Sequence, residues 1–130
     1  MTVHPSLDGW RVLIVEDELM VALLEEELLQ QAGCEVVGPA STVAQALRLV
    51  SEERLDGAVL DVNLGKETVY PVADRLSAAG VPFVFITGYG QSGLAEGYKD
   101  AMTIRKPFDL VTFERDLTAA LVGAGRKPGR

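Results

Sequence analysis

Five polar side chains follow or end short apolar segments of the chain. They are Glu16, Asp17, Asp61, Thr87 and Lys106. Three carboxylates in contact repel one another, so a cluster of these residues is stable only with a bound cation or with some acids protonated. Oxygen ligands in a partly hydrated site favour Mg²⁺. A carboxylate beside a divalent metal, an ammonium and a hydroxyl is a set suited to moving a phosphoryl group.

Each of these residues also has an ordinary structural explanation when it is taken alone. An acidic pair such as Glu16-Asp17 is favourable at a helix N-terminus. Thr87 is a β-branched residue that ends a strand, and Lys106-Pro107 suits a surface turn. It is their joint occurrence at successive strand ends that favours a site, with Asp61 as the nucleophile that would form an acyl phosphate.

The elements that must position these groups alternate along the chain. The apolar segments expected to form strands are Trp10–Val15, Cys34–Gly38, Gly57–Asp61, Val81–Thr87 and Met102–Arg105. Strands that alternate with helices through short connections predict a parallel sheet covered on both faces. We therefore expect a doubly wound (βα)5 flavodoxin-like α/β domain with a five-stranded sheet in the order 2-1-3-4-5. The carboxyl ends of its strands share one edge, where the five side chains would meet.

Apolar residues at helical spacing predict the helices between these strands. In the first helix, Val21, Leu24, Leu28 and Ala32 share one face, and we interpret Glu25, Glu26 and Glu27 as solvated charges on the other. The stretch 88–97 contains four glycines and predicts a fourth helix that is short or mobile.

Sequence signals also mark the other helices. Thr42 with Gln45 matches a capping box at the start of the second helix. Pro71 suits the first turn of the third helix, where Val72, Ala73 and Leu76 would face the core. Asp109 is the expected cap of a last helix with an apolar stripe of Phe113, Leu117, Ala120 and Leu121. Pro39–Ser41 and Val62–Val69 are expected to be a turn and a loop.

Composition bounds the class of protein. A chain of 130 residues fits one domain, expected over residues 10–122, with a lead-in at 1–9 and a flexible basic tail at 123–130. The net charge of −7 argues against nucleic acid as a direct partner. No apolar segment could span a membrane, and residues 1–10 lack a secretory signal. The single cysteine, Cys34, is expected to be a small buried hydrophobe in a reducing, cytoplasmic compartment.

From Trp10 to Val122 the chain resembles a response-regulator receiver domain of two-component systems. The resemblance rests on Glu16-Asp17, Asp61, Thr87 and Lys106-Pro107-Phe108, each at its place in the strand order. It implies that Asp61 accepts a phosphoryl group from a sensor histidine kinase or phosphotransfer protein, with Thr87 as switch hydroxyl and Lys106 as partner of the acyl phosphate.

The resemblance also implies a metal set and a loop geometry. Glu16, Asp17, Asp61 and the backbone carbonyl of Asn63 would bind Mg²⁺, and Pro107 would follow a cis bond. Such a protein is a phosphoacceptor in signalling that assists its own phosphorylation and dephosphorylation rather than an enzyme acting on other substrates.

Two features depart from many receivers. The position three residues before the lysine, where many receivers carry an aromatic switch residue, is Thr103. The segment Phe85-Ile86-Thr87-Gly88-Tyr89 resembles a subgroup of receivers marked by Phe-x-Thr-Gly-Tyr, which often stand alone without an output domain. Tyr89 is then the candidate that replaces the missing aromatic. We expect phosphorylation to reorder residues 87–105 for a downstream protein partner or a phosphorelay.

Two other functions fit parts of the pattern. A phosphorylation-independent interaction module on the same fold would not need the intact acidic pair, Asp61, Thr87 and Lys106, and Mg²⁺ affinity would distinguish it. A phosphatase of the haloacid-dehalogenase kind would need a general acid two residues after Asp61. That residue is Asn63, which cannot protonate a leaving group.

Overall fold

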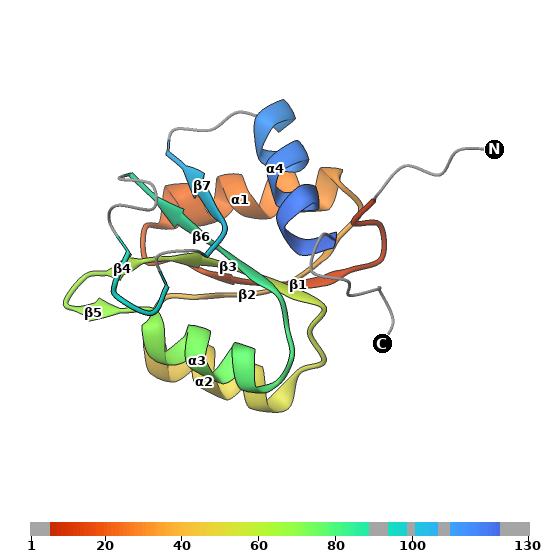
Figure 1. Ribbon diagram of the computed structural model, residues 1–130. Coiled ribbons are helices and arrows are strands. Elements are labelled where there is room, and N and C mark those ends of the chain that lie inside the picture. The colour runs from red at the N-terminus through yellow and green to blue at the C-terminus, as the bar shows by residue number, and fades with distance from the viewer. Residues whose placement is uncertain (1–5, 89–93, 99–100, 107–109, 123–130) are drawn as a thin grey trace.

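A five-stranded parallel sheet forms the centre of the molecule (Figure 1). The computed structural model describes residues 6–88, 94–98, 101–106 and 110–122. The strands lie in the order β2-β1-β3-β6-β7, which confirms the predicted doubly wound topology. Their bounds are β1 Arg11–Val15, β2 Glu35–Ala40, β3 Gly57–Asp61, β6 Phe83–Thr87 and β7 Thr103–Arg105.

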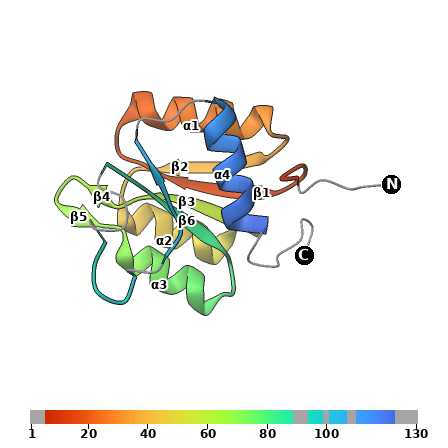
Figure 2. The ribbon, with the colours of Figure 1, turned by 45° about the horizontal axis from the view of Figure 1, so that its top comes forward.

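Helices cover both faces of this sheet. The four helices of the described residues are α1 Leu19–Gln31, α2 Val43–Glu52, α3 Tyr70–Ala78 and α4 Leu110–Val122. Helices α1 and α4 lie over one face and α2 and α3 over the other, as both ribbon views show (Figures 1 and 2). The sheet thus separates two apolar clusters, one that includes Leu76 of α3 and one that includes Leu117 of α4.

The central strand β3 explains why the polar residues meet. All five of its residues are buried, as expected for a strand covered on both faces. Asp61 ends β3 and lies opposite Ile86 of β6, while Thr87 lies opposite Arg105 of β7. The last residues of these strands therefore share the carboxyl edge of the sheet.

The buried face of α1 lies one position away from the predicted stripe. Its buried residues are Ala22, Glu25, Leu28 and Leu29. Leu24, which we expected to face the core, is 42% exposed, and Glu25, expected in solvent, is wholly buried. The prediction for Glu25 was wrong because the run of leucines and glutamates in this helix allows two adjacent stripes.

The capping box of α2 is confirmed in part: Thr42 caps the first turn, while the Gln45 side chain bonds to the N–H of Ser41 and not to that of Thr42. The Gln45 backbone N–H donates to Thr42 Oγ1 at 3.2 Å, and Gln45 Oε1 in turn accepts from the Ser41 backbone N–H at 2.9 Å. The apolar residues predicted for α3 are all buried, as are those of the last helix. These helices therefore pack as the pattern predicted.

A charged network lies at the amino edge of the sheet. The Arg11 guanidinium donates to the Arg54 carbonyl at 2.8 Å and pairs with Glu53 at 2.7 Å and with Glu35. The Arg11 backbone N–H donates to buried Asp56, which also pairs with Arg54 at 3.0 Å. This network ties the starts of β1 and β2 to the loop between α2 and β3.

Two connections differ from the sequence prediction, and a third, where a short fourth helix was expected, is described only in part. Strand β2 continues to Ala40 through a cis Gly38–Pro39 bond, where we expected a turn at Pro39. The expected loop 62–69 contains a small antiparallel pair, β4 Asn63–Leu64 and β5 Glu67–Thr68. The described residues between β6 and β7, namely 88, 94–98 and 101–102, form hydrogen-bonded turns and belong to no helix.

The lone cysteine lies where the sequence predicted. Cys34 is buried beside α1, and its Sγ donates to the Leu7 carbonyl at 3.6 Å. Burial raises the pKa of this thiol to about 12. In the described part of the chain, no helix combines the length and apolar character that crossing a membrane requires.

Candidate functional site

Three carboxylates from two strand ends meet at the carboxyl edge. Glu16 and Asp17 follow β1, and Asp61 ends β3. One oxygen from each lies within 4.8 Å of the others. Glu16 and Asp61 are buried and Asp17 is exposed, so the cluster opens to solvent on one side.

Lys106 supplies the positive charge of the cluster. Its Nζ lies 3.6 Å from Asp61 Oδ2 and 3.8 Å from Glu16 Oε1. Its backbone N–H donates to the Thr87 carbonyl at 3.0 Å, which fixes the start of its side chain beside β6. Burial opposes the charge of Lys106, yet the nearby carboxylates of Asp61 and Glu16 outweigh it and raise its pKa.

Thr87 places a hydroxyl at the same edge. It is the last residue of β6 and is buried. Asp61 lies opposite Ile86, so Thr87 stands one residue further along the neighbouring strand. All five residues that the sequence singled out therefore lie at one edge of the sheet, although their chemical roles do not follow from position alone.

The buried Glu16 carboxylate has the properties of a cation ligand. Its Oε2 accepts a hydrogen bond from the Glu18 backbone N–H at 3.2 Å. Its Oε1 has no hydrogen-bond partner among the described residues. Burial, followed by the adjacent Asp61, raises the pKa of Glu16 to about 8. An orphaned buried oxygen within a set of hard oxygen donors fits a divalent cation such as Mg²⁺.

Glu25 is a further acidic group behind this cluster, and sequence analysis missed it. The side chain comes from α1 and is 0% exposed, and neither carboxyl oxygen has a hydrogen-bond partner in the described part of the molecule. Burial, followed by the charge of Glu16, raises its pKa to about 9. Its spacing of three and four residues from Leu28 and Leu29 is the sequence signal that could have placed it inward.

The remaining predicted site residues have different outcomes. Asn63 begins β4, two residues beyond Asp61, and its carbonyl as a metal ligand stays a prediction. Thr103 lies in β7 opposite Phe85, so no aromatic occupies that strand position. Tyr89 and Pro107 lie outside the described residues, and the same holds for Asp109 as a helix cap.

Comparison with known proteins gives one consistent family. Residues 12–117 match the response regulator receiver domain family. The phyllosphere-induced regulator PhyR of Methylorubrum extorquens is 34% identical over 114 residues, which cover 85% of this chain and 43% of PhyR. This chain thus spans less than half the length of PhyR.

Solved structures agree with the sequence match. The solution structure of SdrG from Sphingomonas melonis Fr1 has a TM-score of 0.77 and 38% identity, covering 87% of this chain and 96% of SdrG. The BeF3-activated conformation of SdrG, from Pseudomonas melonis Fr1, has a TM-score of 0.75 at the same identity, covering 88% of this chain and 98% of that chain.

Proposed function

Because this chain belongs to the response regulator receiver domain family, we propose that it carries a signal by accepting a phosphoryl group on Asp61. The donor would be a phosphohistidine of a sensor kinase or phosphotransfer protein, and the reaction would depend on Mg²⁺. The observation that carries this proposal is the pairing of Asp61 with Lys106 at 3.6 Å beside the carboxylates of Glu16 and Asp17.

The proposed step is a phosphoryl transfer between two side chains. An Asp61 carboxylate oxygen attacks phosphorus, the phosphorus–nitrogen bond to the donor imidazole breaks, and a phosphorus–oxygen bond forms. The product is an acyl phosphate on Asp61, and the electron pair of the broken bond stays with the imidazole. Little covalent chemistry is left to the protein, so position and charge neutralisation dominate.

Other residues of the edge would neutralise the new charge. The Lys106 ammonium is already drawn to Asp61 and would pair with the phosphoryl oxygens. The Thr87 hydroxyl would donate a hydrogen bond to them. Glu16, Asp17, Asp61 and the Asn63 carbonyl would hold a magnesium ion, which supplies electrostatic stabilisation of the phosphoryl oxygens when bound.

The start of α1 offers a surface for the donor protein. Four of its apolar side chains are exposed: Leu19, Met20, Leu23 and Leu24. The helix begins three residues after Glu16, so this surface borders the phosphoacceptor edge. An apolar helix face beside a reacting carboxylate suits a donor that presents its histidine from an amphipathic helix. We therefore propose this face as the contact for the phosphohistidine protein.

A test measures intact mass after incubation with acetyl phosphate, with and without Mg²⁺. We expect the wild type to gain one phosphoryl group only with Mg²⁺, and Asp61→Asn to gain none. Asp116→Asn is the matched control, because it removes one exposed carboxylate from α4 and should react like the wild type.

Three outcomes would contradict the proposal. Stoichiometric phosphate on Asp61→Asn would place the acceptor elsewhere. Equal labelling without Mg²⁺ would remove the role of the metal. A wild type that binds Mg²⁺ but takes no phosphate from acetyl phosphate or from histidine kinases would favour the phosphorylation-independent module. The presence of Thr103 where many receivers have an aromatic residue in this strand also favours that module.

A further inference from the structure

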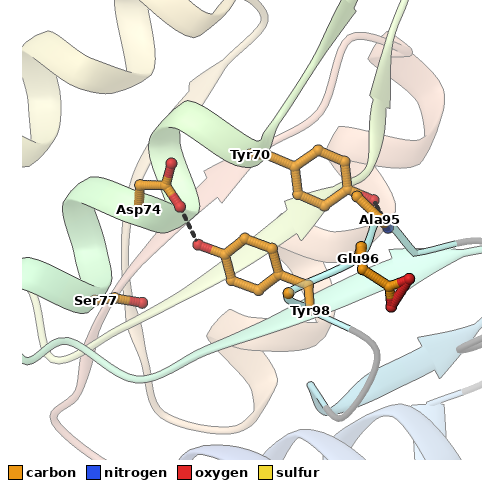
Figure 3. Close-up of a pocket in the computed structure, with 7 residues that line it drawn as sticks. Tyr70, Asp74, Ser77, Ala95, Glu96 and Tyr98 are labelled. Atoms are coloured by element: carbon orange, nitrogen blue, oxygen red, sulfur yellow. Dashed lines mark hydrogen bonds between the residues drawn. The ribbon is translucent and has the colours of Figure 1, made fainter.

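Two stacked tyrosines join α3 to the segment that precedes β7. The rings of Tyr70 and Tyr98 lie 5.4 Å apart between centroids with an interplanar angle of 17°. Tyr70 begins α3, whereas Tyr98 belongs to residues 94–98, which follow β6 in the chain. Both tyrosines line a cavity of about 570 Å³, and Figure 3 shows their rings side by side.

Two hydrogen bonds hold this stack. The Tyr98 hydroxyl donates to Asp74 Oδ1 of α3, and the Ala95 backbone N–H donates to the Tyr70 hydroxyl oxygen at 2.8 Å (Figure 3). Each side thus supplies one tyrosine and one partner for the other tyrosine. We call Tyr70, Asp74, Ala95 and Tyr98 the tyrosine clasp.

The clasp touches the strand that carries the switch hydroxyl. Phe85 of β6 meets Tyr98 edge to face at 5.5 Å and Tyr70 at 5.8 Å. Phe85 stands two residues before Thr87, so both side chains point to the same face of the sheet. A displacement of the end of β6 is therefore transmitted to the clasp by direct contact with a buried ring.

In the structure that holds this clasp, Lys106 Nζ lies 3.6 Å from Asp61 Oδ2. Strand β7 carries Thr103 opposite Phe85, so its own side chain cannot act as an aromatic switch there. Tyr98 supplies an aromatic ring against Phe85 instead. Burial, with the Asp74 hydrogen bond, raises the pKa of Tyr98 to about 12, so the hydroxyl remains a donor at neutral pH.

We propose that Tyr98, fastened to α3 through Asp74, is the positioning residue that links Asp61 phosphorylation to the surface of the molecule. The clasp is closed in the unphosphorylated protein and opens when Thr87 moves to the phosphoryl group. This inference rests on the proposed phosphorylation of Asp61. According to this inference, phosphorylation changes the surface between α3 and residues 94–98. In many receivers the corresponding change occurs at an aromatic residue of the last strand.

The first experiment compares rates of phosphorylation by acetyl phosphate in Tyr98→Phe, Asp74→Ala and the double variant. Each change removes the same hydrogen bond and leaves the ring or the helix in place. Loss of one such bond should increase the rate by about three- to tenfold, because the closed clasp no longer opposes the phosphorylated state. The double variant should match the singles, since the two residues act as one unit.

The controls separate coupling from charge and stability. Asp116→Ala removes a half-exposed carboxylate from α4 by the same change and should keep the wild-type rate. Melting temperatures of all variants show whether a rate change merely follows loss of stability. Unchanged rates in the single variants, or effects of Tyr98→Phe and Asp74→Ala that add in the double variant, would overturn the proposal.

A second experiment separates this inference from the proposed function. The protein is labelled with 3-fluorotyrosine, and the ¹⁹F resonances are assigned with Tyr→Phe variants. Addition of BeF3⁻ and Mg²⁺ should shift the Tyr98 resonance together with the Asp61 and Thr87 amides. Amide shifts without a Tyr98 shift would overturn the clasp and leave the phosphoacceptor site standing. No amide shift at all would overturn both.

Discussion

Glu25 is the residue that departs most from the usual rules of burial. A carboxyl group without a hydrogen-bond partner in the described structure is costly in an apolar interior, and such groups keep a proton instead of a charge. The groups that face it are Glu16 after β1, Asp61 of β3 and Lys106 after β7. Two of these three are acids, so the surroundings also disfavour a charge on Glu25.

This burial has a consequence for stability. The pKa of Glu25 rises from 4.5 to about 9 in the folded protein, so the native state holds a proton that the unfolded chain has lost. Stability from this group is complete below pH 4.5 and is lost as the pH rises toward 9. The slope for one proton is at most about 1.4 kcal/mol per pH unit.

We expect Glu25→Gln to flatten this pH dependence. Denaturant unfolding in metal-free buffer from about pH 5 to about pH 9 measures it. Glu16, whose pKa rises to about 8, would leave a smaller residual slope in the variant. Glu27→Gln, an exposed change on the same helix, should retain the wild-type slope. A wild-type free energy of unfolding that rises with pH across this window would contradict the prediction.

At the residue scale, the sequence predicted the positions of side chains at strand ends. It did not predict the positions of side chains that depend on how elements pack together. Asp61, Thr87 and Lys106 could be located because a parallel sheet brings strand ends to one edge whatever the side chains do. Whether Glu25 faces inward depends on how α1 is rotated about its axis against the sheet. The adjacent stripes of leucine in this helix do not determine that rotation. Tyr98 could not be found, because its partners Tyr70 and Asp74 are distant in sequence.

Among the elements, α2 shows how a local signal fixes a helix start. Thr42 Oγ1 accepts from the Gln45 N–H, and the Gln45 side chain accepts from the Ser41 N–H. The first bond satisfies a backbone donor that the first turn of a helix leaves without a partner, and the second holds the residue before the cap. The helix therefore begins at Val43, where the sequence predicted.

We expect Thr42→Ala to lower the free energy of unfolding by about 1 kcal/mol. Urea denaturation at one pH measures the change. Ser51→Ala is the matched control on the same helix. The Ser51 hydroxyl donates to the Leu47 carbonyl at 3.1 Å and accepts a long hydrogen bond of 3.5 Å from exposed Arg75, and alanine favours a helix interior. Equal losses in both variants would mean that the hydroxyl at Thr42 has no special role as a cap.

Long elements could be predicted and short ones could not. Strand β3 and the buried faces of α3 and α4 follow from apolar patterns that extend over several residues. The pair β4–β5 has two residues per strand, too few for an alternating pattern to show. Strand β2 passes through Pro39, a residue that local rules assign to a turn.

In the molecule as a whole, the two edges of the sheet differ: a network of ion pairs lies at the amino edge, and the candidate site lies at the carboxyl edge. The Arg11 network ties three segments together at the amino edge of the sheet. The carboxyl edge carries the acid cluster, the start of α1 and the loop that leads to the clasp. Motion during signalling is thus expected at the carboxyl edge, while the amino edge holds the strands in register.

The exposed apolar face of α1 gives a prediction at this scale. Met20 is 77% exposed and Leu23 is 48% exposed. Met20→Gln with Leu23→Gln should lower kcat/KM for a phosphorylated histidine phosphotransfer protein by about tenfold, since burial of both side chains against the donor is lost. The donor is one that labels the wild type.

Acetyl phosphate separates docking from chemistry in the same variants. It needs no protein contact, so its rate should stay at the wild-type value. Val111→Gln, a change of an apolar side chain that is 72% exposed on α4, should affect neither donor. An equal loss with both donors would assign the effect to the site itself, and no loss with either would exclude this face as the contact.

Cys34 makes the protein convenient for site-specific labelling. It is the only cysteine of the chain, and its buried thiol, with a pKa of about 12, holds almost no reactive thiolate at neutral pH. Maleimides and thiol-reactive spin labels are therefore expected not to react with Cys34. A single cysteine introduced at exposed Ser77, beside the clasp, can carry a probe on an otherwise silent background, without first removing the native thiol.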